Sequence, residues 1–240
     1  MAGTAPSISS APTVAPSAPN PVAIPPLQNG DRLSAAEFWR RYSAMPSSER
    51  AELIQGVVYM SSPVTHENHG SAHFSLIGWL FLYQMVTPGV DGGDNSTLSL
   101  DIGNTPQSDA YLIILPSHGG RVRIDDKGYI VGAPELAAEV SATSTSIDLG
   151  DKLKTYLQNG VREYVVWRVF DRAIDWFVLR GDHYEPLKSG TDGIYRSEVF
   201  PGLWLDAAAL IARDMATVAR VAQQGTASPE HAAFVAQLKK

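Results

Sequence analysis

Three residues have the types and the order that phosphodiester chemistry uses, namely Asp109, Glu139 and Lys152. Asp109 opens one apolar run and Glu139 lies in the next, so both carboxylates fall on predicted core strands, and Lys152 falls on the helix predicted after them. Two carboxylates on neighbouring strands can share one Mg²⁺ or Mn²⁺, because such cations prefer oxygen ligands. A lysine beside them can position or deprotonate a nucleophile. The pattern predicts a metal site formed by Asp109 and Glu139, with Lys152 next to it.

The helix predicted over about 148–159 carries two lysines, and helical periodicity distinguishes them. Lys152 lies one turn before Tyr156, whereas Lys154 is rotated roughly 200° away from Lys152 at about 100° per residue. We therefore expect Lys152 to lean toward the sheet and Lys154 to face solvent.

The elements that must position these residues alternate between strands and helices. Ser34 and Glu37 form a capping-box pattern that begins the first helix, and clusters of proline and glycine, including residues 88–95, mark turns. Helices are predicted over about 34–45, 64–86, 148–159, 206–224 and 229–238. Strands are predicted over about 52–60, 97–102, 109–115, 135–141, 163–170, 173–180 and 183–187, the last three as a continued hairpin. This mixture predicts an α/β fold.

The chain divides into three predicted segments. Residues 1–30 carry seven prolines and no charged residue, a composition that predicts a disordered tail. Residues 31–212 are long enough for one sizeable core and are expected to form a single domain. Residues 213–240 are expected to form a C-terminal helical extension.

The composition excludes several kinds of site. The chain has no cysteine, which excludes disulfides, thiolate nucleophiles and cysteine-ligated metals. The formal net charge is −6, so a nucleic acid would have to bind a local basic patch. No apolar run reaches the roughly 18–20 residues of a membrane-spanning helix, and the start of the chain lacks the pattern of a secretory signal. The cytoplasm is the expected location.

Seven segments of the chain occur in the order of one known family: ELIQGVVYM, HENHG, DNSTLSLDI, QSDAYLI, GAPELAAEV, DLGDKLKTYLQNGVREYVVWRV and FPGLWLDAAAL. As a set, over about Glu52 to Leu210, they resemble the Uma-type restriction endonucleases, a former domain of unknown function within the PD-(D/E)XK nuclease superfamily. The resemblance implies a restriction-endonuclease-like mixed β-sheet flanked by helices, to which the sequence adds a C-terminal β-hairpin and a helical tail. It also implies a divalent-metal nuclease acting on nucleic acid, DNA above all, and a homodimer.

The resemblance also assigns roles residue by residue. Asp109 falls at the aspartate of the family's Pro-Asp pair, Glu139 at the glutamate of its Glu-Val strand, and Lys152 at its helix lysine. Glu52 matches the early glutamate of the Glu-Leu-Ile-x-Gly segment. The implied catalytic residues are Asp109, Glu139, Lys152 and Glu52, and the implied ligands of Mg²⁺ or Mn²⁺ are Asp109 and Glu139.

Two positions depart from the superfamily pattern. Ser108 stands where the proline precedes the aspartate, and Ser141 stands where a strand lysine would follow Glu139 by two residues. The second departure makes the mechanism depend on the lysine of the helix, Lys152.

Each candidate also has a structural interpretation, which the residues alone leave open. These are a strand-end cap for Asp109, a salt bridge to Arg162 or Arg168 for Glu139, an i,i+4 pair with Asp148 for Lys152, and a pair with Arg50 or an amide cap for Glu52. A further cluster contains His66, His69 and His73, of which the last two are four residues apart and could face one zinc ion. The spacing is not HExxH, so we interpret these residues as loop and helix-start histidines.

Three functions are compatible with these patterns. The leading hypothesis is a Mg²⁺-dependent DNA endonuclease. The second is a catalytically inactive nuclease-fold homodimer that acts as a binding or regulatory module, because a fold does not guarantee a function. The third is a metal-assisted hydrolase of a small phosphorylated or amide substrate. No P-loop, dinucleotide-binding or nucleophile-elbow motif supports a nucleotide-dependent enzyme or a serine hydrolase.

Overall fold

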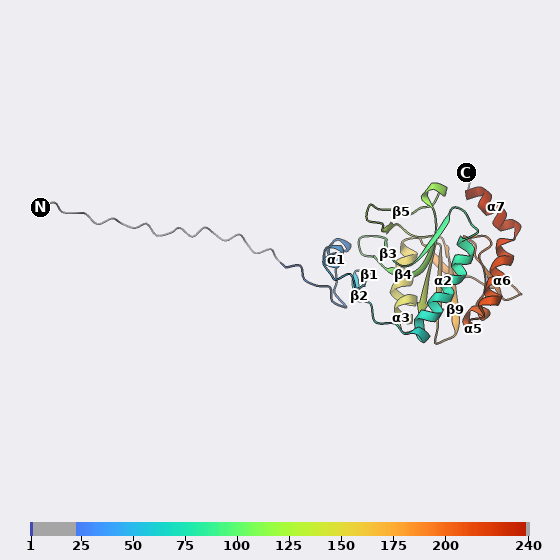
Figure 1. Ribbon diagram of the computed structural model, residues 1–240, viewed down its shortest axis with the longest axis horizontal. Helices are drawn as coiled ribbons and strands as arrows, with labels where there is room; N and C mark the ends of the chain where they lie inside the picture. The colour runs from blue at the N-terminus through green and yellow to red at the C-terminus, as the bar shows by residue number, and fades with distance from the viewer. Residues whose placement is uncertain (2–22, 239–240) are drawn as a thin grey trace.

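The computed structural model describes Met1 and residues 23–238, and Figure 1 shows the path of the chain. Most of the predicted disordered tail over 1–30 lies outside the described residues. Its last residues lie inside them, where Leu27 is 5% exposed and the amide of Gly30 donates to Val58 O over 2.8 Å. The prediction of disorder is therefore wrong for Leu27 to Gly30, which packs on the body of the protein.

Within the described residues, eight strands form one mixed sheet in the order β10-β9-β8-β7-β4-β3-β6-β5. Their bounds are β3 (Val90–Ser99), β4 (Gln107–Ile114), β5 (Arg123–Ile124), β6 (Ile130–Val131), β7 (Leu136–Ser141), β8 (Glu163–Arg168), β9 (Ala173–Arg180) and β10 (His183–Pro186). Neighbours run antiparallel except β7 with β8 and β3 with β6, which run parallel. The predicted hairpin is confirmed: β8 pairs with β9, and β9 continues into β10.

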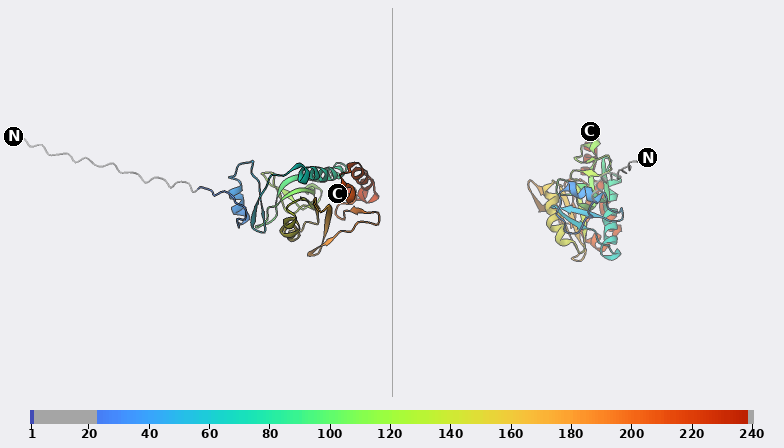
Figure 2. Two further views of the ribbon diagram at one scale, coloured as in Figure 1. Left: turned by 90° about the horizontal axis from the view of Figure 1, so that it is seen from below. Right: turned by 90° about the vertical axis from the view of Figure 1, so that its left-hand side faces the viewer.

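Helices cover both faces of this sheet. The helices are α1 (Ala35–Tyr42), α2 (Ser71–Gln84), α3 (Thr145–Ile147), α4 (Leu153–Gln158), α5 (Ala207–Ala212), α6 (Met215–Thr226) and α7 (Pro229–Leu238), with short π-helical turns η1 (His66–Gly70) and η3 (Asp148–Lys152) and a 3₁₀ turn η2 (Pro116–His118). Of these, α1 lies beside the sheet and packs against residues 51–58. Figure 2 shows α2 and the red C-terminal helices on one side of the sheet, with the segment η3–α4 on the other.

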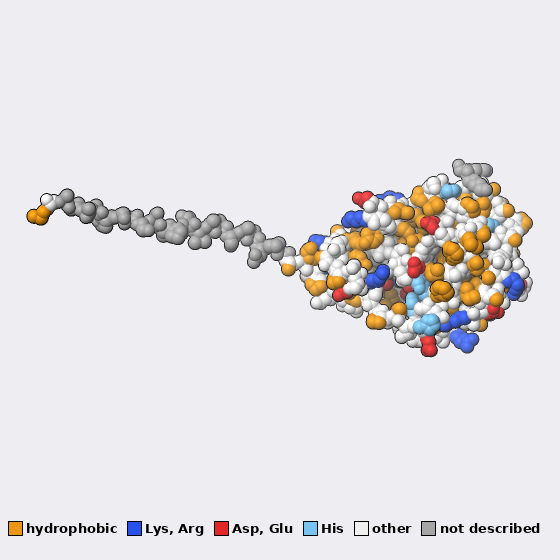
Figure 3. Space-filling view, viewed as in Figure 1, with side chains coloured by type: hydrophobic (Ala, Val, Ile, Leu, Met, Phe, Trp, Pro, Cys, Tyr) orange, Lys and Arg blue, Asp and Glu red, His pale blue; other side chains and the backbone are white. Residues whose placement is uncertain are grey.

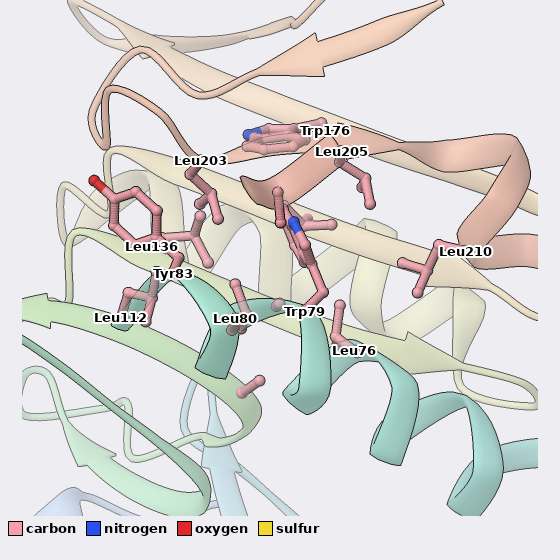
Figure 4. Packing of buried hydrophobic residues seen from close by; sticks show 14 of the residues in the cluster. Leu76, Trp79, Leu80, Tyr83, Leu112, Leu136, Trp176, Leu203, Leu205 and Leu210 are labelled. Carbon is pink, nitrogen blue, oxygen red and sulfur yellow. The ribbon is translucent and has the colours of Figure 1, made fainter. Parts of the chain in front are cut away.

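Alternation along β7 decides which side chains meet which helices. Leu136 and Val140 belong to the core under α2 and the C-terminal helices, whereas Ala137 belongs to the core under η3–α4. Glu139 shares the parity of Ala137, so it faces η3–α4. The first core is built around Trp79, whose ring is fully buried (Figure 4). Truncating a large core side chain of this kind to alanine costs about 3–5 kcal/mol.

The stretch predicted as one strand over 52–60 is instead a hairpin of β1 (Ala51–Ile54) and β2 (Val57–Met60). Gln55 and Gly56 both have positive φ, 51° and 73°, the backbone of a tight two-residue hairpin turn. Leu53 forms backbone hydrogen bonds in both directions with Thr105, just before β4. The hairpin thereby carries Glu52 to the start of β4.

The turn predicted within residues 88–95 is also partly wrong, because β3 already begins at Val90. A Cβ added to Gly92 would lie 2.9 Å from Leu112 Cδ2 and 3.0 Å from the backbone oxygen of Tyr111, so a larger residue would force β4 or the Leu112 side chain to shift. The glycines that suggested a turn are required by strand packing.

The C-terminal residues are helical as predicted, but the helix predicted over 206–224 is broken. Arg213 has φ of 60°, and the side chain of Asp214 then caps α6. Val218, Ala222 and Leu238 lie in the same core as α2 and the sheet. The predicted boundary after residue 212 falls at a helix break within this core.

The predicted fold class is confirmed, since a large mixed sheet, whose strands β8 to β10 form the predicted hairpin, is flanked by helices and followed by C-terminal helices. In the described part of the chain, none of the helices combines the length and the apolar character needed to cross a membrane.

Candidate active site

Two predicted site residues lie at one edge of the large sheet, where β4 begins and β7 ends. In this antiparallel pair Ala110 stands opposite Ala138. The pairing ends there, and Asp109 and Glu139 are the next residues outward along β4 and β7. The side chain of Asp109 is 17% exposed and that of Glu139 only 3%.

Lys152 joins the two predicted glutamates at this edge. Its Nζ lies 2.9 Å from Glu139 Oε2 and 3.1 Å from Glu52 Oε2, and it donates to Gln107 O over 3.0 Å. An ammonium group has three hydrogens, so each of them has an acceptor. The side chain of Lys154 is 63% exposed. The predicted orientations of both lysines are confirmed.

Tyr156 completes the cluster one helical turn after Lys152. Its hydroxyl donates to Glu139 Oε1 over 2.9 Å. Burial raises the pKa of the Tyr156 phenol well above its usual value, and the carboxylate of Glu139 raises it further. The phenol therefore stays protonated and acts as a donor.

The pKa values of Glu52, Glu139 and Lys152 are all raised in this cluster. Burial raises the pKa of Glu139 well above its usual value and also raises the pKa of Glu52. The charge of Lys152 lowers both pKa values, whereas the charge of Asp109 raises both. Burial by itself would lower the pKa of Lys152, but Glu139 and Glu52 together raise it well above its usual value. All three groups hold protons more strongly than usual, as expected of a cluster that is short of positive charge.

Asp109 makes different contacts from the glutamates. Its Oδ2 accepts a hydrogen bond from the amide of Val140 over 2.7 Å, across the strand pair. Its Oδ1 faces the imidazole of His69, with 3.7 Å to Nε2. The two predicted metal ligands are thus neighbours that bond to different partners, because the oxygens of Glu139 face Lys152 and Tyr156.

Two histidines of the predicted cluster lie over this sheet edge. His69 Nδ1 is 3.1 Å from Val140 O, and His73 Nε2 is 2.7 Å from Asp109 O. Their rings are 5.3 Å apart between centroids. In Figure 3 histidine side chains gather beside acidic ones on the face that carries α2.

The structural interpretations hold only in part. Arg168 does not pair with Glu139 but binds Asp175, with 2.6 Å between Nε and Oδ2. Asp148 accepts a hydrogen bond from Ser144 Oγ over 2.5 Å, whereas the short ion pairs of Lys152 are with glutamates.

Glu52 does cap an amide, but not one beside it in the chain. Its Oε2 accepts from the amide of Gln107 over 3.0 Å, at the start of β4. The same oxygen pairs with Lys152, so the cap and the ion pair coexist.

The two serines that depart from the superfamily pattern form local hydrogen bonds. Ser108 Oγ donates to Ala110 O over 2.7 Å, and Ser141 Oγ donates to Thr145 Oγ1 over 2.8 Å. Both side chains are buried. With serine at position 141, no positively charged side chain stands there on β7, and Lys152 provides one from the neighbouring helix.

No set of three or more histidine, aspartate or glutamate side chains within residues 23–238 is arranged as a ready metal site. Hard cations are often held by only one or two carboxylates, with waters and substrate oxygens completing the shell. The chemistry of the donors fits such a cation, because Glu52 and Glu139 share a single ammonium group and the charge of Asp109 adds a third carboxylate at this edge.

Comparison with known proteins connects this arrangement to a family. The family model for Uma2, described as “Putative restriction endonuclease”, matches residues 35–208. The chain belongs to the Uma2 family. The match spans both the β1–β2 hairpin and α4, so all four predicted site residues of this Uma2 protein lie within it. No curated protein matches the chain.

A solved structure has the same fold as this Uma2 protein. It is the crystal structure of “a putative nuclease belonging to DUF820” from Anabaena variabilis ATCC 29413, with a TM-score of 0.53 and 13% sequence identity. The likeness covers 72% of the Uma2 chain and 97% of the other. At this identity it shows a shared fold, and the resemblance inferred from the sequence segments is confirmed.

Sequence reasoning missed three contacts in this Uma2 site. Tyr156 was recognised only as a marker of the helix face, although its i,i+4 spacing from Lys152 signals a shared contact. The backbone oxygen of Gln107 and the orientation of His69 have no signal in the sequence, because both depend on long-range packing.

Proposed function

We propose that this Uma2-family protein is a metal-dependent endonuclease that hydrolyses phosphodiester bonds in nucleic acid, with DNA as the expected substrate. The observation that carries the proposal is the buried cluster of Lys152 with Glu52 and Glu139 beside Asp109, at one edge of a mixed sheet. The description of the family as a restriction endonuclease and of the solved neighbour as a nuclease supports the same reaction class.

The reaction needs a divalent cation, for which Mg²⁺ or Mn²⁺ is the expected choice. Asp109 and Glu139 would hold it, because carboxylate oxygens are the ligands that these cations prefer. When bound, the cation supplies positive charge at the scissile phosphate. The excess of acidic groups at this edge supports its binding, since the raised pKa of Glu139 reflects burial and nearby negative charge.

The contacts of Lys152 indicate how it acts. All three of its hydrogens have protein acceptors, and the residue is 4% exposed. In this arrangement Lys152 positions Glu52 and Glu139 and offsets part of their charge. A direct role in deprotonating the nucleophile would require it to leave these acceptors.

A cavity at the end of β8, on the face of the sheet that carries α2, supports a polyanionic substrate, and its lining is separate from the four predicted site residues. It has a volume of about 330 Å³, and its lining includes Arg172, Arg213 and Trp167. Arg213 also donates to Glu67 O, just before the histidines of the site. Guanidinium groups bind phosphate well, so the two arginines supply the local basic patch that an acidic protein needs for nucleic acid.

A cleavage assay with the full chain tests the proposal. Duplex DNA, single-stranded DNA and RNA would be incubated with Mg²⁺, with Mn²⁺ or with a chelator, using wild type, Asp109→Asn and the control Asp126→Asn at an exposed position. We expect metal-dependent cleavage by wild type and the control and none by Asp109→Asn. If wild type cleaves none of these substrates, the protein is better explained as a catalytically inactive binding module. If Asp109→Asn cleaves as well as wild type, the site assignment is wrong.

We further propose that the protein is a homodimer and acts in the cytoplasm, as predicted from the sequence. Large apolar side chains on the outer face of α2 support the dimer, because Phe74 is 80% exposed, Phe81 55% and Met85, just after the helix, 62%. Exposed apolar side chains that share one helix face are typical of a contact surface.

A further inference from the structure

His69 is attached to the candidate site at both ring nitrogens. Nδ1 lies 3.1 Å from Val140 O, and Nε2 lies 3.7 Å from Asp109 Oδ1. The side chain is 18% exposed, so it is held at the rim of the site with one side open to solvent.

The two contacts determine which nitrogen carries a hydrogen. A carbonyl oxygen can only accept, so Nδ1 must donate its hydrogen to Val140 O. In a neutral ring Nε2 then carries a lone pair, and that lone pair faces the carboxylate of Asp109. Two acceptors without a hydrogen between them repel each other, and either a proton on Nε2 or a metal cation between them removes the repulsion.

The contact at Nδ1 is the one that metal-bound histidines usually make. A histidine that ligates through one nitrogen almost always donates its other N–H to a carbonyl, a carboxylate or a water, which fixes the ring orientation. In this protein the acceptor is Val140 O, and the amide of Val140 donates to Asp109 Oδ2. One residue of β7, Val140, therefore orients both His69 and Asp109.

The local backbone also holds His69 in place. Thr65 O accepts hydrogen bonds from the amides of both His69 and Gly70, which closes the π-helical turn η1 before α2 begins. Such turns are rare and occur frequently at functional sites. His73, one turn further on, donates to Asp109 O and secures the strand that carries Asp109.

We propose that His69 Nε2 is a ligand of the divalent cation together with Asp109, and that the site consequently prefers Mn²⁺ to Mg²⁺. The inference rests on the proposed function, because it concerns the same metal. Imidazole nitrogen suits first-row transition metals, whereas Mg²⁺ prefers oxygen ligands alone. Glu139, engaged by Lys152 and Tyr156, is then the more remote of the two predicted carboxylate ligands.

Pulsed EPR of the full chain loaded with Mn²⁺ tests this inference without any measurement of cleavage. An imidazole ligand gives a ¹⁴N modulation, which should be lost when wild type is produced with ¹⁵N-labelled histidine. The modulation should also be absent in His69→Gln and present in His66→Gln, whose histidine lies exposed on the same turn. Titration should show Mn²⁺ affinity weakened about tenfold or more in His69→Gln, with a much smaller change for Mg²⁺.

The outcomes separate this inference from the proposed function. If Mn²⁺ binds and depends on Asp109 but gives no histidine modulation, His69 is only an ion-pair partner of Asp109 and the inference is wrong while the nuclease proposal stands. If the modulation persists in His69→Gln, another histidine is the ligand and the inference is also wrong. If wild type binds neither Mn²⁺ nor Mg²⁺, both proposals fail.

Discussion

Lys152 Nζ lies 2.9 Å from Glu139 Oε2, and both side chains are at most 5% exposed. A charge pair as buried as this costs several kcal/mol to desolvate, so it stabilises the fold only through its geometry and its additional hydrogen bonds. Here Tyr156, Glu52 and Gln107 provide those bonds. The pair is therefore a sensitive point for both stability and activity.

Loss of Lys152 should be costly, whereas loss of Lys154 should not. Lys152→Ala leaves the buried Glu139 and the partly buried Glu52 without a cation and should destabilise the fold by about 3–5 kcal/mol. Lys154 forms only an exposed pair with Asp151, worth about 0–1 kcal/mol. Urea denaturation measures both, and cleavage should be abolished only in Lys152→Ala.

Lys152→Ala can lose activity simply by unfolding. The coupling energy between Lys152 and Glu139 should therefore be measured by a double-mutant cycle of Lys152→Met and Glu139→Gln. Residues in direct contact couple by roughly 0.5–3 kcal/mol. A coupling energy near zero would show that the 2.9 Å contact contributes nothing.

The raised pKa of Glu139 predicts a particular pH dependence of stability. The folded state binds the carboxyl proton of Glu139 more tightly than the unfolded state does. The protonated carboxyl group therefore contributes to the free energy of unfolding at pH values below the usual pKa of glutamate, and this contribution is lost as pH rises through the raised pKa. Without metal, Glu139→Gln should therefore gain Tm relative to wild type as pH rises from about 5 to about 8.5, a range in which Lys152 stays charged.

Thermal unfolding in a chelator checks this prediction, with Glu49→Gln at an exposed position as the control. A Tm difference between wild type and Glu139→Gln that stays constant over this range would contradict the shift, as would an equal change in the control.

Mn²⁺ should stabilise the folded protein through Asp109. At roughly 100 times its Kd, a ligand that binds only the folded state stabilises it by about 2.7 kcal/mol. For a domain of this size that corresponds to a Tm rise of roughly 5–10 °C. Thermal unfolding should show this rise in wild type and Asp126→Asn but not in Asp109→Asn. An equal rise in all three proteins would place the metal elsewhere.

The outer face of α2 should mediate the dimer. Phe81 is 55% exposed there, and a charge in a dimer contact is strongly unfavourable. Light scattering after size exclusion should give twice the chain mass of 25.9 kDa for wild type and the monomer mass for Phe81→Glu. Phe170→Glu, at a 59% exposed phenylalanine after β8, is the control and should stay dimeric. A monomeric wild type would exclude the dimer.

The C-terminal helices should be part of the main core, which a glycine substitution can test. A Cβ on Gly225 would collide with Gly202 O and lie 2.7 Å from Trp204 Cγ. We expect Gly225→Ala to destabilise the whole protein in one transition by about 1–3 kcal/mol. Gly150→Ala, where the added Cβ has no neighbour within 4 Å, should be neutral or stabilising by up to about 1 kcal/mol. Separate unfolding of residues 213–240 would support an independent extension.

The sequence by itself determined the elements whose signals are local. Ser34 caps α1 as predicted, and its Oγ accepts from the amide of Glu37. Gly160, with φ of 74°, follows α4 where the helix was predicted to end. Helical periodicity also separated Lys152 from Lys154, because the direction of a side chain on a helix depends only on its position in the repeat.

The tertiary structure decided what depends on contacts between distant segments. The glycines of β3 predict a turn in isolation, and only Leu112 on the neighbouring strand shows why Gly92 is needed in a strand. Likewise His69 precedes Asp109 by forty residues, and no spacing rule relates them. Their 3.7 Å approach arises because α2 packs over the edge where β4 begins. Packing of this kind sums many weak contacts across the chain, so it has no signature within any short window of sequence.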